Sequence, residues 1–206
     1  MLLQRIQQQF IDSADLKYQC AQLLAPQVEA ATQAVLASVT GGGKVMTCGN
    51  GASASAAQQF AASFVGRYDR ERPELAAMCL SADTAVLTGI AADFDARLVY
   101  CRQVRALGQA GDVLLALSTS GNSASVLAAV EAAHERDMTV VALTGGRGGR
   151  LVQMLRDTDV QVCVPHELPA RVHEIHHLVL HCICDGVDAQ LLGLPDNLNP
   201  EQEIAT

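Results

Sequence analysis

A cluster of hydroxyl groups in the segment STSGNS, residues 118–123, could bind a phosphate group. The segment follows the apolar run VLLAL and precedes an alanine-rich run, a pattern that predicts a strand, a tight turn and the start of a helix. The first turn of a helix offers unpaired N–H groups and the positive end of the helix dipole, both of which attract anions. The hydroxyls that could add donors to phosphate oxygens belong to Ser118, Thr119, Ser120 and Ser123.

A second segment, CGNGASAS at residues 48–55, has the same arrangement after the apolar run KVMT. The residues at its predicted turn are Asn50, Gly51, Ala52 and Ser53. Either segment alone is as consistent with an ordinary helix cap as with a binding site, because Ser, Thr and Asn cap helices frequently. Two such turns after strands of one sheet favour an anionic ligand.

The glycines of the first turn also allow a nucleotide site. Gly49, Gly51 and Ala54 fit the G-x-G-x-x-A dinucleotide fingerprint, although this short pattern is weak by itself. Asp83, the acidic residue near the end of the next predicted strand, lies further along than the usual ribose-binding position. A P-loop motif is absent from the sequence. A nicotinamide-dependent enzyme therefore stays a minor alternative.

Three histidines near the C-terminus could bind a metal. His173, Glu174 and His177 spell H-E-x-x-H, the motif of zinc peptidases, and His181 would extend the two histidines into a ladder on one helix face. The competing interpretation is that a five-residue pattern recurs by chance and that helix histidines are usually solvated or hydrogen-bonded in a core. Zinc binding is left open, and peptidase activity is the weaker alternative.

An α/β fold would position these side chains. Strand-like apolar runs alternate with longer segments of helical periodicity, which predicts a parallel sheet with helices on both faces. The strands are expected at 44–48, 76–80, 113–117, 139–143 and 160–164, and the last helix at Pro169–Leu192. Two helices, Leu2–Leu24 and Pro26–Val39, are expected before the first strand. We predict a single domain at 1–194 and a mobile polar tail at 195–206.

Composition and charge argue against several functions. The chain has 206 residues, a formal net charge of −8 and a pI near 5.1, whereas proteins that bind nucleic acid directly usually present a basic surface. No apolar stretch approaches the roughly 20 residues of a membrane span, and the N-terminus lacks the apolar run of a secretory signal. The seven cysteines form no C-x-x-C pair. We expect a cytoplasmic protein with reduced cysteines that contacts neither membrane nor nucleic acid.

Five segments together resemble a known family. They are CGNGASA, GRYDRERPELAA, VRALGQAGDVLLALSTSGNS, RDMTVVALTG and ARVHEIHHLVLH. The chain from about Ile6 to Leu192 resembles the sugar isomerase (SIS) family, in the branch of the phosphoheptose isomerases and the DnaA initiator-associating factor. The resemblance implies a flavodoxin-like five-stranded parallel sheet and a homotetramer with sugar-phosphate sites at subunit interfaces. The implied substrate contacts are Asn50, Gly51, Ala52, Ser53, Asp93, Ser118, Thr119, Ser120, Ser123 and His173.

The catalytic positions implied by the resemblance are only partly retained. Moving a carbonyl between the first two carbons of a sugar requires a base and an acid. The family's isomerases use a Glu and a His, and bind zinc through a His, that Glu, a Gln and the second His. His181 matches the catalytic His, whereas Ser63 occupies the Glu position and Gln59 the first His position. His173 stands in place of the Gln, so His173 and His181 are the remaining candidate zinc ligands.

The absence of a carboxylate at residue 63 favours a regulator over an enzyme. A serine hydroxyl cannot act as a carboxylate base near neutral pH. Ser63 is also typical of the DnaA initiator-associating factor, which implies a phosphosugar-binding protein that acts on replication initiation through DnaA. The alternative is an active sedoheptulose 7-phosphate isomerase in which another acid, such as Asp93 or Glu174, supplies the base.

Overall fold

The computed structural model describes residues 1–193 and contains a five-stranded parallel sheet. The strand order is β2-β1-β3-β4-β5, the order of flavodoxin-like folds. The strands are β1 (Val45–Cys48), β2 (Ala77–Cys79), β3 (Val113–Ser118), β4 (Thr139–Gly145) and β5 (Val160–Val164). Their bounds differ from the predicted ones by at most two residues, so the predicted fold class is confirmed. The predicted tail at 195–206 lies outside the described residues.

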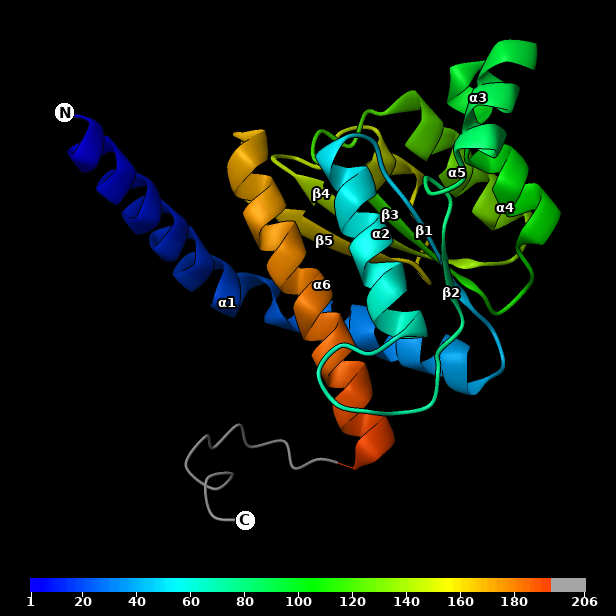
Figure 1. Cartoon of the computed structure of the whole chain (residues 1–206), viewed down its shortest axis with the longest axis horizontal. Coiled ribbons are helices and arrows are strands. Elements are labelled where there is room, and N and C mark those ends of the chain that lie inside the picture. Colours follow the sequence, from blue (N-terminus) through cyan, green and yellow to red (C-terminus); the bar gives the residue numbers. More distant parts are fainter. Residues whose placement is uncertain (194–206) are drawn as a thin grey trace.

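Helices cover both faces of the sheet (Figure 1). The helices are α1 (Leu2–Thr40), α2 (Ala52–Val65), α3 (Thr84–Asp93), α4 (Cys101–Leu107), α5 (Ala124–Glu135) and α6 (Pro169–Leu192), with short 3-10 turns η1 (Ala96–Leu98) and η2 (Leu151–Met154). One face carries α1, α2 and α6, and the other carries α4 and α5. No helix of the described chain is long and apolar enough to cross a membrane.

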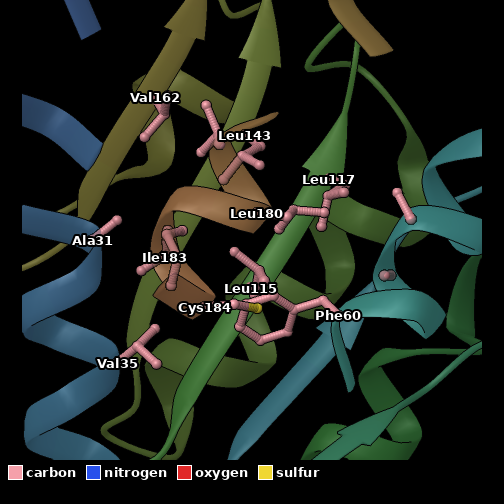
Figure 2. Close-up of a cluster of buried hydrophobic side chains, with 14 of the residues drawn as sticks. Ala31, Val35, Phe60, Leu115, Leu117, Leu143, Val162, Leu180, Ile183 and Cys184 are labelled. Carbon is pink, nitrogen blue, oxygen red and sulfur yellow. The ribbon is translucent and has the colours of Figure 1, made fainter. Parts of the chain in front are cut away.

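The alternation of side chains along β3 produces two separate cores. Leu115 and Leu117 point toward α1, α2 and α6, while Leu114 and Ala116 pack with α4 and α5. Figure 2 shows the first core, in which side chains of α1, α2 and α6 converge on the central strands. Both faces of β3 are buried, which explains its continuous apolar sequence.

The N-terminal segment differs from the prediction. It forms one helix of 39 residues that contains Pro26, instead of two helices. Figure 1 shows that its first half projects away from the sheet and its second half packs beneath it. A proline removes one hydrogen bond and bends a helix without necessarily ending it, which accounts for the apparent break in the sequence pattern. The projecting half exposes Leu2, Leu3, Phe10 and Ile11, each more than half accessible.

The strand order brings the two predicted turns together. After β1 the chain crosses to β2 on one side of the sheet, and the next strand, β3, returns to the other side of β1. Ligands of open parallel sheets bind outside the carboxyl ends of the strands at such a switch point. The turns of residues 49–51 and 119–123 follow β1 and β3 at this point.

Candidate functional site

The turns after β1 and β3 are joined by hydrogen bonds. The Asn50 amide nitrogen donates to the hydroxyl oxygens of Ser123, at 2.6 Å, and Ser125, at 3.0 Å. Gly51 begins α2 with a positive φ of 56°, a conformation that favours glycine. The two segments singled out in the sequence therefore meet at one edge of the sheet.

Tyr100, which was not predicted from the sequence, holds the first turn by hydrogen bonding. Its hydroxyl lies 2.5 Å from the Gly49 carbonyl oxygen and 3.0 Å from the Asn50 side-chain oxygen. Burial raises the pKa of Tyr100 to about 12, so the phenol stays protonated and donates a hydrogen bond at neutral pH. This contact orients the Asn50 amide group so that its nitrogen faces Ser123.

The hydroxyls of Ser120 and Ser123 in the second turn have different neighbours. Ser123 faces Asn50, whereas the Ser120 hydroxyl accepts a hydrogen bond from the Asn122 N–H at 3.2 Å. Thr119 and Ser120 line a cavity on the side of β4, and Ser118 is buried at the end of β3. Within residues 1–193 the side chain of the N-cap residue Ser123 makes no capping hydrogen bond to α5, so the first amides of this helix are open to a ligand between these groups.

The cavity beside the turn has a volume of about 310 Å³. The connection after β4, residues 146–150, forms its opposite wall and is bonded to the turn, because Leu151 N donates to the Gly121 oxygen at 2.9 Å. A Cβ at Gly121 would lie 1.9 Å from the Gly148 oxygen, so only glycine permits this contact. The run TGGRGGR was the sequence signal for this third loop, and the sequence analysis did not use it.

Ser63 and His181 lie together in a second pocket, between α2 and α6. This pocket has a volume of only about 10 Å³ and is lined by Ala56, Gln59, Phe60, Ser63, His177, Leu180, His181 and Cys184. His181 packs against the Tyr68 ring at a centroid distance of 5.6 Å. None of the lining residues is a carboxylate. The pocket therefore offers imidazoles and a hydroxyl for proton transfer, but no carboxylate base.

The H-E-x-x-H segment does not form a zinc-peptidase site. Glu174 is paired with Arg171 at 2.5 Å, and the His177 Nδ1 atom lies 2.9 Å from the His173 carbonyl oxygen. Burial, followed by the charge of His177, lowers the pKa of His173. Among residues 1–193 no group of three or more His, Cys, Asp and Glu side chains could hold a metal ion. With Ser63 in place of a carboxylate, the residues present do not fit the family's zinc centre.

The remaining candidates lie on α3, at its N-cap and in the first turn of α2. Asp93 is the exposed last residue of α3, and within the described chain it has no hydrogen bond to the other candidate residues. Asp83, considered for a ribose, caps α3 by accepting a hydrogen bond from Val86 N at 3.0 Å. Ala52 and Ser53 occupy the first turn of α2, next to Asn50.

A buried ion pair fixes α2 against α6. The Arg72 Nε atom lies 2.5 Å from a carboxylate oxygen of Asp188 in α6, and both side chains are almost fully buried. The same guanidinium donates to the carbonyl oxygens of Ser63 and Phe64, each at 2.9 Å, at the end of α2. Arg72 therefore connects the helices that carry Ser63 and His181.

The chain is similar to several known proteins. The model of the SIS domain matches residues 9–145. A phosphoheptose isomerase of Methylibium petroleiphilum is 59% identical over 196 residues, which are 95% of this chain and 98% of that protein. One of Azoarcus sp. is 52% identical over 95% of this chain and 99% of its own length. The structure of a phosphoheptose isomerase from Neisseria gonorrhoeae superposes with a TM-score of 0.88 at 46% identity, over 92% of this chain and 100% of that chain.

Proposed function

Because the chain belongs to the SIS domain family, we propose that it binds a sugar phosphate and interconverts its ketose and aldose forms as a phosphoheptose isomerase. From the sequence alone this function was the alternative to the regulator, and the close relatives named phosphoheptose isomerase favour it over the regulator. The observation that carries the proposal is the joining of the two turns through Asn50 and Ser123 at the switch point of the sheet.

The chain's own groups supply binding and proton transfer at different places. The turn at 119–123 and the open amides of α5 bind the phosphate through charge-assisted hydrogen bonds. The sugar chain then extends toward the pocket between α2 and α6, which is lined by the imidazoles of His181 and His177. A neutral imidazole accepts the proton from the carbon beside the carbonyl while the carbonyl oxygen takes up a proton, which gives an enediol. Return of the first proton to the former carbonyl carbon, with loss of a proton from the neighbouring hydroxyl, completes the isomerisation.

The regulator is the second candidate, and Ser63 is the observation that favours it. The residues that line the α2–α6 pocket include no carboxylate, so the group that the resemblance implies as the base is missing while the phosphate turn is intact. In this case the protein binds a sugar phosphate without converting it and acts through a protein partner, for which DnaA is the candidate implied by the resemblance.

A homotetramer is part of the proposal for either function. The projecting half of α1 exposes several large apolar side chains on one segment, and such a segment usually packs against another subunit. Light scattering on the full-length protein at micromolar concentration is expected to give the mass of four chains. A monomer would contradict this assembly and any site shared between subunits.

An assay of the purified protein with sedoheptulose 7-phosphate tests the function. Turnover of about 1 s⁻¹ or more, unchanged by added zinc, supports an isomerase that uses an imidazole. Calorimetric binding without turnover supports the regulator. If the protein neither binds nor converts the sugar phosphate, both candidate functions are wrong.

A further inference from the structure

Two oppositely charged side chains, Arg147 and Glu167, line the cavity beside the hydroxyl turn. Arg147 comes from the connection between β4 and η2, and Glu167 from the connection between β5 and α6. Both are exposed, and within residues 1–193 neither forms an ion pair or a side-chain hydrogen bond. Because the two charges do not neutralise each other, each is available to a ligand in the cavity.

The backbone around Arg147 is held in a defined turn. Gly148 N donates to the Gly145 oxygen at 3.0 Å, which places Arg147 at the tip of a four-residue turn. The flanking Gly146 and Gly148 have φ values of 63° and 76°, which favour glycine. Gly145 N also donates to the Thr119 oxygen at 3.0 Å. This hydrogen bond fixes the position of the Arg147 turn relative to the hydroxyl turn.

Glu167 is held next to the same loop. Gly146 N donates to the carbonyl oxygens of Val164, at 2.9 Å, and His166, at 3.1 Å, which joins the β4 loop to the segment before α6. A Cβ at Gly146 would lie 2.9 Å from a carboxylate oxygen of Glu167, so the carboxylate rests directly against this glycine. Leu168 N donates to the His166 ring at 3.0 Å and fixes the backbone on the other side of Glu167.

We propose that Arg147 and Glu167 select ligands with a single anionic group, the phosphate, on a neutral polyhydroxylated chain. This inference rests on the proposed binding of a sugar phosphate. Arg147 adds a guanidinium to the phosphate donors of the turn, and Glu167 accepts hydrogen bonds from sugar hydroxyls. The same carboxylate repels a ligand that carries a second negative charge, such as a phosphorylated sugar acid.

Isothermal titration of the full-length protein with sedoheptulose 7-phosphate and with 6-phosphogluconate tests the proposal. Arg147→Gln is expected to weaken the binding of both ligands about tenfold. Glu167→Gln is expected to strengthen the binding of 6-phosphogluconate about tenfold relative to sedoheptulose 7-phosphate. The matched controls are Arg150→Gln, in the same loop but outside the cavity lining, and Glu131→Gln, exposed on α5; both are expected to bind like the wild type.

The outcomes separate this inference from the proposed function. If the wild type binds sedoheptulose 7-phosphate but the Arg147 and Glu167 variants behave like their controls, the selection by charge is wrong and sugar-phosphate binding stands. If the wild type binds neither ligand, the proposed function is wrong and this inference falls with it. If Glu167→Gln strengthens the binding of both ligands equally, the proposed selectivity is also wrong, because the Glu167 carboxylate would then repel the phosphate that both ligands share.

Discussion

The cavity beside the hydroxyl turn and the pocket between α2 and α6 differ in size and in chemistry. The cavity measures about 310 Å³ and is lined by hydroxyls, an amide, a guanidinium and a carboxylate. The pocket measures about 10 Å³ and combines imidazoles with apolar side chains, Gln59 and Ser63. The cavity is formed mainly by loops, whereas the pocket is formed by two helices, α2 and α6. In the proposed function, ligand binding and proton transfer therefore depend on different parts of the chain, and one can be lost while the other is retained.

The largest expected effect comes from disrupting the support of the α2–α6 pocket. Replacing Arg72 by Ala leaves Asp188 as a buried charge without its partner, and removing one member of a buried pair typically costs about 3 to 5 kcal/mol. Urea unfolding is expected to show this loss of stability. Because Arg72 does not line the cavity, the folded fraction should bind sugar phosphate like the wild type. An unchanged unfolding midpoint would show that the pair does not hold the two helices together.

The pH dependence of stability tests the connection between the two regions. His176 in α6 donates through Nε2 to the carbonyl oxygen of Thr144 in β4 at 3.0 Å, and burial is the main cause that lowers the pKa of His176 to about 4. Between pH 4 and about 6.5 the unfolded chain therefore binds a proton that the folded chain does not. Stability is expected to fall by about 3 kcal/mol as the pH drops from 7 to 4.

The control for this titration is His176→Gln, which cannot take up the proton. The difference in unfolding free energy between pH 7 and pH 4 should be smaller in the variant than in the wild type by about 3 kcal/mol. If the unfolding free energy falls equally with pH in the two proteins, His176 does not titrate as a buried neutral group.

Restoring a carboxylate in the α2–α6 pocket would bring its chemistry closer to that of the family's isomerases. Ser63→Glu is expected to raise the isomerase rate constant by about 10², below the upper end of general-base contributions because the new side chain is imperfectly placed. The assay compares it with Ser63→Gln, which has the same size and no basic group. If both variants turn over sedoheptulose 7-phosphate equally, proton transfer does not occur at residue 63.

A loss of ligand affinity is expected from changes in the hydroxyl turn. Replacing both Ser120 and Ser123 by Ala should weaken sugar-phosphate binding more than tenfold, since each charge-assisted hydrogen bond contributes about 1.5 to 3 kcal/mol. The single variants show which side of the turn holds the phosphate, because Ser120 faces the cavity and Ser123 faces Asn50. Thr88→Ala, on the exposed surface of α3, is the control. If calorimetry shows unchanged affinity in the double variant, the turn is not part of the binding site.

Local patterns in the sequence were sufficient to predict the fold class, the five strands and the last helix. Apolar runs buried on both faces and helical periodicities depend on short-range spacing, which the sequence displays directly. The two turns were recognised for the same reason, because Gly, Ser and Asn after a strand and before a helix form a local signal.

Only the tertiary structure decided which groups meet. A proline that looked like a break lies inside one long helix, because packing of the second half of α1 beneath the sheet outweighs one missing hydrogen bond. The hydroxyls of Ser120 and Ser123 have different neighbours, and Arg147, Glu167, Tyr100 and Arg72 reach the site from distant positions in the chain. Their roles depend on contacts between residues far apart in sequence, and a single sequence carries no local signal for such contacts.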